Sequence, residues 1–310
     1  MAREELLRLG AKLKLDSAAA EIVGRLDDAG IPAVLLKGSA LAERLYDPSE
    51  VRPHEDVDLL VAAADVDAAG EVLRREGFAY AADDDYAQDW IRAADGVTVD
   101  VHVTFLGVGV TPAAVWDVLA PHTTTLSLGG ADLTVFDDAA LALHVALHAA
   151  QHGPKGGKAL DDLRRAARQI DLAAWREAEQ IAEQLDAVPA LSAGLRLVSE
   201  GVTIADALQL PVASLADVML RASSPPPTTL GLQRLFTTRG VRPKLTFLAH
   251  ELAPSPTFMR AVYPVAQRGR AGLAASYAWR PFWLLWHALP ALRAWRRAER
   301  ASRRFSPPGS

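Results

Sequence analysis

The segment His54-Glu55-Asp56-Val57-Asp58-Leu59-Leu60-Val61 decides the fold expected for this chain. Its apolar and acidic residues alternate, which is typical of a strand with one buried face. The apolar side chains would point to one side, and Asp56 and Asp58 to the other. Residues two apart on a strand project from the same face, about 7 Å apart along the strand. Two carboxylates in this position can converge on divalent cations, which prefer oxygen ligands.

A second signal lies upstream, at Lys37-Gly38-Ser39. A helix capped by Asp16-Ser17 and ended by Gly30 would precede a buried strand over residues 33–36, and a short helix would follow over residues 40–46. The start of a helix attracts phosphate through free N–H groups and the helix dipole, and glycine allows a close approach. We therefore expect the glycine and serine to contact phosphate groups. The lysine ends an apolar strand and needs an anionic partner, either a phosphate or an aspartate.

A predicted hairpin further along the chain supplies a third carboxylate. Tyr86 to Ala93 and Val97 to Phe105 flank Asp95-Gly96, a strong signal for a tight turn. Valines alternate with polar residues in the second arm, so Asp100 and His102 would share one polar face. Asp100 would join the aspartate pair. His102 would either line the acceptor side of a cleft or pack at its edge.

Three carboxylates near a phosphate-binding loop indicate phosphoryl-transfer chemistry. Mg²⁺ prefers hard oxygen ligands and retains substrate phosphates in its coordination shell. Two such ions about 4 Å apart stabilise the attacking and leaving oxygens of an in-line displacement. We expect Asp56 and Asp58 to hold two Mg²⁺ ions, with Mn²⁺ as the alternative metal. Asp100 would complete the site of the catalytic ion and help to deprotonate the acceptor hydroxyl, and Arg52 would contact phosphate or lie in solvent.

These residues, in segments 35–41, 52–61 and 99–102, resemble a bacterial nucleotidyltransferase family whose members are mostly uncharacterised. That family belongs to the DNA polymerase beta-like superfamily. The similarity continues through segments 143–153 and 160–163, so it covers residues 16 to 175. The resemblance implies that the metal-binding aspartates of the superfamily fall on Asp56, Asp58 and Asp100, and its phosphate motif on Gly38-Ser39.

Two features depart from the family pattern. Sixteen residues separate Ser39 from Asp56, a longer interval than in most of the superfamily. Glu55 occupies a position where the family usually has a small residue. Its side chain would crowd the loop or add negative charge beside the metals, so Glu55 is the residue that most challenges the assignment.

Alanine-rich helical spacing dominates the chain after residue 137. His144, His148 and His152 lie four residues apart and would form one stripe along a helix. We expect this stripe to line the cleft and contact the nucleotide or the acceptor, with Lys158 at the start of the next helix. A packed interface is one alternative. A Zn²⁺ site is another, although ligands along one straight helix give poor tetrahedral geometry; its further ligand would be Asp161 or Asp162.

The composition is that of a globular protein with an acidic body and a basic end. Half of the 310 residues are hydrophobic, the net charge is −5, and there is no cysteine. Disulfides and thiolate metal sites are therefore excluded, and a cytoplasmic location is expected. Residues 291–310 carry six arginines against Glu299, which leaves −10 on the rest. The N-terminus lacks a signal-peptide pattern, and the apolar run 282–292 is shorter than the roughly 20 residues that span a bilayer.

Tryptophans cluster near the basic end, at Trp279, Trp283, Trp286 and Trp295. A helix packed in a core would explain them, and a surface for a membrane, a peptide or another protein is the alternative. Peripheral contact through this Trp/Arg-rich C-terminus is therefore left open, while no nucleic-acid partner is expected. Ser223 to Thr228 indicates a linker or a long loop.

Together these patterns predict an α+β fold. A polymerase beta-like nucleotidyltransferase domain with a mixed β-sheet would occupy residues 1–137, and an α-helical acceptor-binding domain with a basic tail residues 138–310. The predicted activity is Mg²⁺-dependent transfer of NMP, most often AMP, from an NTP to a hydroxyl or phosphate of a small molecule, natural-product peptide or protein, with release of pyrophosphate. The alternatives are a catalytically inactive nucleotide-binding or scaffolding module, and a metal-dependent hydrolase built on the histidine stripe.

Overall fold

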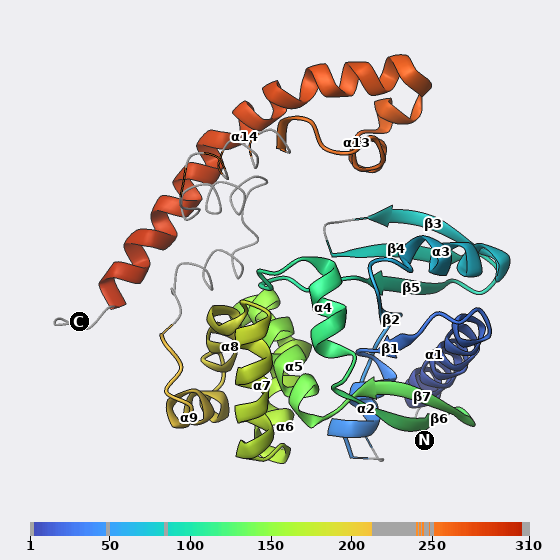
Figure 1. Cartoon of the computed structure of the whole chain (residues 1–310), viewed down its shortest axis with the longest axis vertical. Coiled ribbons are helices and arrows are strands. Elements are labelled where there is room, and N and C mark those ends of the chain that lie inside the picture. The colour runs from blue at the N-terminus through green and yellow to red at the C-terminus, as the bar shows by residue number, and fades with distance from the viewer. Residues whose placement is uncertain are drawn as a thin grey trace. The chain divides into compact units, whose positions relative to one another are not determined.

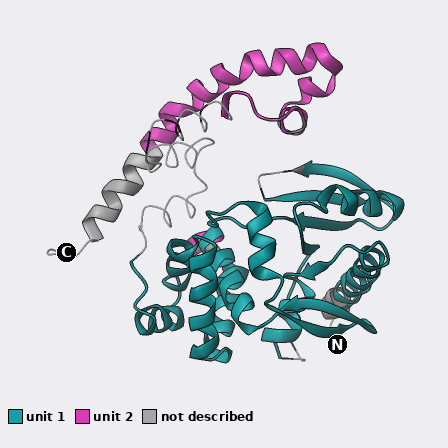
Figure 2. Ribbon diagram, in the orientation of Figure 1, with its two compact units in different colours: residues 1–151, 156–212 teal, residues 152–155, 213–310 magenta. Residues whose placement is uncertain are grey.

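The computed structural model describes residues 3–47, 50–83, 86–212 and 251–305, together with residues 240, 242, 244 and 248. The chain divides into two compact units, coloured teal and magenta in Figure 2. Unit 1 comprises residues 1–151 and 156–212, and unit 2 comprises residues 152–155 and 213–310. The three aspartates predicted to bind metal all lie in unit 1.

A seven-stranded mixed sheet forms the centre of unit 1, in the spatial order β3-β4-β5-β2-β1-β7-β6 (Figure 1). β2 pairs with β5 in parallel, as β1 does with β7, and the other neighbours are antiparallel. This confirms the predicted α+β class. The strands are β1 (Ala33–Leu35), β2 (Asp56–Val61), β3 (Phe78–Asp83), β4 (Ala87–Arg92), β5 (Val97–His102), β6 (Thr123–Leu128) and β7 (Ala131–Phe136).

Helices precede, interrupt and follow the sheet. The predicted cap at Asp16-Ser17 is wrong, because α1 begins at Arg3 and runs through both residues. The helical elements up to residue 212 are α1 (Arg3–Asp28), α2 (Ser39–Leu45), α3 (Val66–Arg75), α4 (Pro112–Leu119), α5 (Asp138–His152), the short 3₁₀ turn η1 (Gly153–Lys155), α6 (Gly157–Gln169), α7 (Leu172–Gln184), α8 (Val188–Leu195) and α9 (Ser199–Ala207).

The two faces of the sheet pack against different helices. Val57, Leu59 and Val61 lie in a core shared with α1 and α3. Leu60 lies in a second core, which includes residues of α2 and of α4 to α9. This division confirms the alternation predicted for β2. By the same alternation, Asp56 and Asp58 lie on the Leu60 face of the sheet.

The predicted domain boundary at residue 137 does not coincide with the division between the units. The second core joins Val34 and Leu60 of the sheet region to residues of α5, α6, α7 and α8. In α5 alone, 11 of the 15 residues are buried. A helix that is apolar on most of its surface has to be enclosed. Residues 138–151 and 156–212 therefore belong with the sheet in unit 1, and acceptor binding by residues 138–310 stays a prediction.

In the part of unit 2 that the structure describes, α13 (Pro256–Val262), η2 (Pro264–Gln267) and the long helix α14 (Gly269–Phe305) follow one another. Trp283 of α14 contacts the ring of Tyr263 edge-on. Trp279 and Trp286 are exposed, so the predicted core-packed helix is wrong for these two side chains. The predicted linker at 223–228 lies outside the described residues.

Candidate active site

Three aspartates form a row across the sheet. Asp58 of β2 lies directly opposite Asp100 of β5, and Asp100 lies opposite Asp89 of β4. Neighbouring strands are about 4.8 Å apart, so the three side chains emerge side by side from one face of the sheet. Asp56 emerges from the same face of β2, two residues before Asp58, and lies opposite Thr98.

Asp58 is buried and ionised. Its Oδ1 lies 2.6 Å from Nζ of Lys37 and 3.1 Å from Nε2 of His102. Burial by itself would raise the pKa of Asp58, but the hydrogen bond from His102 and the charge of Lys37 outweigh it and hold the pKa below its ordinary value. Because an ionised carboxylate only accepts hydrogen bonds, His102 donates through Nε2. Lys37 thus has the anionic partner that its position at the end of an apolar strand predicted.

Asp100 has the opposite electrostatic character. Burial raises its pKa, and the negative charges of Asp58, Asp89 and Asp56 raise it further, to about 7. The row therefore carries more negative charge than its surroundings neutralise. A cation placed among these carboxylates would relieve the repulsion.

Asp58, Asp100 and His102 have the geometry of a metal site. Each offers one ligand atom, and these atoms all lie within 4.8 Å of one another. Two carboxylate oxygens and an imidazole nitrogen fit a divalent cation, and the carboxylates are ligands that Mg²⁺ and Mn²⁺ accept. His102 would ligate only through a ring nitrogen that carries no proton, so ligation through Nε2 would replace its hydrogen bond to Asp58. The site thus contains two of the three predicted ligands and adds His102. Asp56 is outside this group, and its role as a ligand stays a prediction.

The Lys37-Gly38-Ser39 loop is held against β2. The backbone N–H of Leu36 donates to the carbonyl oxygen of Asp58 at 3.0 Å, which extends the strand pairing and brings Lys37 beside Asp58. Gly38 has a positive φ of 58°. A Cβ at this position would lie 2.9 Å from Cδ2 of His54, so the close approach of the His54 ring requires glycine here.

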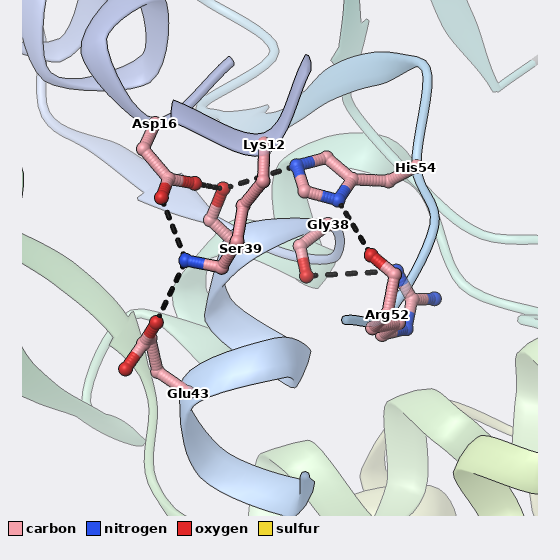
Figure 3. A network of polar contacts seen from close by, with 7 residues as sticks. All are labelled: Lys12, Asp16, Gly38, Ser39, Glu43, Arg52 and His54. Atoms are coloured by element: carbon pink, nitrogen blue, oxygen red, sulfur yellow. Dashed lines mark hydrogen bonds and ion pairs between the residues drawn. The ribbon is translucent and has the colours of Figure 1, made fainter. Parts of the chain in front are cut away.

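The hydroxyl of Ser39 belongs to a buried polar network, which Figure 3 shows. Oγ donates to Oδ1 of Asp16 and lies 3.2 Å from Nε2 of His54. Nζ of Lys12 in turn contacts Asp16 at 2.7 Å and Glu43 at 2.9 Å. These contacts tie α1 to the start of α2. A phosphate contact by the Ser39 hydroxyl stays a prediction, and the phosphate would compete with Asp16 for the hydroxyl proton.

Arg52 is buried in an ion pair and does not lie in solvent. Its Nε and one terminal nitrogen donate to the two carboxylate oxygens of Asp162 in α6, at 2.8 and 2.7 Å. Tyr46 donates to the same carboxylate at 2.7 Å, and the other terminal nitrogen of Arg52 lies 3.5 Å from the carbonyl oxygen of Gly38, as Figure 3 also shows. Arg52 therefore connects the glycine loop to α6. Its predicted phosphate contact remains untested, and the buried pair leaves the guanidinium no exposed surface for it.

The predicted histidine stripe is only partly assembled. His144 is buried, its ring meets that of Phe105 at 4.9 Å, and it stacks on His148 at 6.3 Å. Burial, aided by the charges of Lys37 and His102, lowers the pKa of His144 to about 3, so this imidazole is neutral. His152 and Lys158 are exposed.

The Zn²⁺ alternative finds no support in the part of the chain that the structure describes. Asp162 is occupied by Arg52. Among the described residues, the one group of three metal-ligand side chains is that of Asp58, Asp100 and His102. Within the described part of the chain, His144, His148 and His152 thus belong to no such group.

Residues 7–202 match the model of a protein family described as uncharacterised nucleotidyltransferase. The chain belongs to this family. A comparison with curated proteins finds no significant match.

Solved structures that resemble this nucleotidyltransferase share little of its sequence. The solution structure of the antibiotic-resistance factor ANT(2'')-Ia is 15% identical, over 56% of this chain and 91% of that chain, with a TM-score of 0.40. The crystal structure of ANT(2'')-Ia with adenylyl-2''-tobramycin is 16% identical, over 56% and 95%, also at 0.40. An antigenic nucleotidyltransferase-like protein from Paracoccidioides brasiliensis is 18% identical, over 58% and 92%, at 0.37.

Sequence reasoning missed Asp89 of this nucleotidyltransferase. A two-residue turn at Asp95-Gly96 would pair Ile91 with Asp100. In the structure four residues connect the strands, so Arg92 faces Val97 and Asp89 faces Asp100. The observed register, and not the turn signal in the sequence, therefore places this further carboxylate in the row.

Proposed function

We propose that this nucleotidyltransferase moves a nucleoside monophosphate, most often AMP, from an Mg²⁺-bound NTP to a hydroxyl or phosphate acceptor and releases pyrophosphate. The observation that supports it best is the group of Asp58, Asp100 and His102, whose ligand atoms lie within 4.8 Å of one another. This group lies in a chain whose family consists of nucleotidyltransferases.

In the proposed reaction an acceptor oxygen attacks the α-phosphorus of the NTP, and the bond from this phosphorus to the oxygen that bridges to the β-phosphorus breaks. A divalent cation held by Asp58 and Asp100, and by Asp56 if it joins the site, would neutralise charge on the phosphate oxygens. Lys37 would add a positive charge beside the phosphates, next to the backbone of Gly38 and Ser39. Asp100 would also take the proton of the acceptor hydroxyl, because it lies beside Asp58 on the same face of the sheet.

The acceptor side is the less defined part of the proposal. His102 and His144 flank Phe105, at ring distances of 6.0 and 4.9 Å. Neither ring nitrogen of the buried His144 has a hydrogen-bond partner among the described residues, so a bound acceptor or nucleotide could supply one. His148, His152 and Lys158 would extend this side toward a small molecule, a natural-product peptide or a protein, within the cytoplasm.

Incubation with α-labelled NTPs and a lysate of the source cell tests the proposal. We expect the label to appear in one acceptor together with stoichiometric pyrophosphate, and mass spectrometry of the labelled species would identify the acceptor. Asp56→Ala combined with Asp58→Ala should abolish both signals.

The chain offers a matched control for this double variant. Asp65-Val66-Asp67 repeats the spacing of the catalytic pair at the start of α3. Asp65→Ala with Asp67→Ala removes the same number of charges and should leave transfer unchanged. Turnover by Asp56→Ala with Asp58→Ala at the wild-type rate would disprove the assignment. Tight NTP binding by the wild type without any labelled product would instead favour the inactive nucleotide-binding module.

A further inference from the structure

Helix α14 of unit 2 carries an exposed apolar stripe. Trp279, Phe282, Trp286 and Leu289 follow one another at alternating intervals of three and four residues, which places them on one face of the helix. Their exposed fractions are 57%, 65%, 81% and 63%, and that of the adjacent Leu285 is 70%. No Asp, Glu, Lys or Arg occurs from residue 281 to residue 292. A contiguous apolar surface of this kind marks an interaction site.

The stripe is not the face that holds α14 in unit 2. The opposite face contains Arg280, which is buried and donates through Nε to the carbonyl oxygen of Glu251 at 2.5 Å. The guanidinium of Arg280 also lies 5.0 Å from the ring centroid of Phe258. Tyr277 donates to the carbonyl oxygen of Pro254 at 2.6 Å. Since these contacts anchor the helix through its other side, removal of the stripe would not remove the packing of unit 2.

A basic segment follows the stripe in the sequence. After Leu289 the next four positions in the same alternating spacing of three and four residues are all arginines. Helix α14 continues through them to Phe305. From residue 252 to the end, the chain has ten arginines and one acidic residue, Glu299, so residues 1–251 carry a net charge of −14. The four arginines in this spacing are Arg293, Arg296, Arg300 and Arg303.

We propose that this stripe of α14, with the arginines that follow it, binds the surface of an anionic lipid bilayer. Tryptophan, phenylalanine and leucine side chains insert at the boundary between headgroups and acyl chains, and arginines attract anionic headgroups. This proposal is independent of the catalytic assignment, because it concerns no residue of the sheet.

The dimensions fit a helix that lies on a membrane. At 1.5 Å per residue, the stripe from Trp279 to Leu289 is about 15 Å long, half of the roughly 30 Å of a bilayer core. Among the described residues, no helix has the length and hydropathy of a membrane span. At the positions that follow the stripe spacing, the apolar residues come first and the arginines follow. Proteins that bind single-stranded nucleic acid instead have aromatic side chains distributed along a basic groove. A bilayer surface is therefore the partner that the stripe fits best.

Vesicle flotation of the full chain tests the proposal. The wild type should float with vesicles of phosphatidylcholine and phosphatidylglycerol, should float much less with phosphatidylcholine alone, and should be released by high salt. Trp279→Ser with Phe282→Ser and Trp286→Ser should lose at least about tenfold in vesicle affinity, since each removes apolar area from the bilayer contact. Arg296→Glu with Arg300→Glu should lose binding to the anionic vesicles selectively.

Matched controls come from the same unit. Leu252→Ser with Val265→Ser replaces two exposed apolar side chains that lie off the stripe. Arg268→Glu with Arg270→Glu makes the same charge change outside it, at two exposed positions. Both controls should bind vesicles like the wild type. Circular dichroism and thermal unfolding should be unchanged in the stripe variant and in both controls, because the replaced side chains are exposed. The same two measurements check that Arg296→Glu with Arg300→Glu is folded.

Three outcomes would overturn the proposal. The first is a wild type that fails to float with the anionic vesicles. The second is equal binding by the stripe variant and by its control. The third is evidence for another partner. The wild type could form a dimer while the stripe variant is a monomer, or the wild type could bind a single-stranded RNA homopolymer tightly while the stripe variant does not.

Discussion

The acidic row of the sheet (Asp58, Asp100 and Asp89) and the Arg52–Asp162 pair both contain buried carboxylates, but their electrostatic surroundings are opposite. In the pair, the carboxylate of Asp162 accepts hydrogen bonds from Nε and one terminal nitrogen of Arg52 and from the hydroxyl of Tyr46, so each of its oxygens has a donor. In the row, Asp100 faces the charges of other carboxylates, and its pKa is raised to about 7. A compensated buried charge stabilises one structure, whereas an uncompensated one is ready to bind a cation. Stability and activity should therefore respond in opposite ways to mutations in the two regions.

The largest effect is expected for Asp100→Asn. Loss of this carboxylate should reduce nucleotidyl transfer by about 10³-fold or more, because a metal contact contributes several kcal/mol of transition-state stabilisation. The free energy of unfolding should be unchanged or higher, since repulsion within the row is relieved. Pyrophosphate release and urea denaturation measure the two quantities. A strongly destabilised Asp100→Asn would show that the row is a structural element like the pair.

The converse result is expected for Asp162→Asn. Breaking a buried ion pair leaves the Arg52 charge uncompensated and should cost about 3 to 5 kcal/mol of unfolding free energy in urea denaturation. Asp161→Asn is the matched control, because the neighbouring Asp161 forms an exposed pair with Arg164 on the same helix. That control should cost less than about 1 kcal/mol. Equal stability of the two variants would contradict the structural role of the pair.

Ser39→Ala tests whether the Ser39 hydroxyl contributes to stability, as the Arg52–Asp162 pair does, or to NTP binding, as the acidic row does. The variant leaves the buried Asp16 with Lys12 alone and should lose about 1 to 3 kcal/mol of unfolding free energy. Ser127→Ala removes a similar contact to Asp132 at the surface and should be nearly neutral. If the hydroxyl acts only in the network, KM for the NTP stays at the wild-type value. A rise in KM without loss of stability would identify Ser39 as a phosphate ligand.

The most gradual effect concerns the pH dependence of stability at His144, which is small for each pH unit. Its pKa falls from 6.5 to about 3 in the folded chain, so below pH 6.5 the unfolded chain binds a proton that the folded chain does not. The stability that depends on neutral His144 is therefore present above that pH and is lost as the pH falls toward 3. The stability difference between wild type and His144→Gln should shrink by roughly 1 kcal/mol per pH unit in this window. Parallel stability curves for the two proteins would show that His144 is accessible to protons.

Much of the site could be predicted because it depends on local patterns. The alternation in β2 places Asp56 and Asp58 on one face, and the Asp95-Gly96 turn gives the hairpin that carries Asp100. The partners of Arg52 and Ser39 could not be predicted in this way. Asp162 lies 110 residues from Arg52, and Asp16 lies 23 residues before Ser39. No local rule pairs side chains across such distances.

The sequence by itself determined the strand–loop–strand order, the carboxylates on the polar face and the charge-free aromatic stripe of α14, because strand and helix periodicity fix which residues share a face. Only the tertiary structure decided how each charge is used. It joined Asp58 to Lys37 and His102, committed Arg52 to Asp162, and buried α5 against the sheet so that the unit ends beyond residue 137. The physical reason is burial: a charge removed from water has to find a partner in space, and that partner comes from whichever element packs beside it.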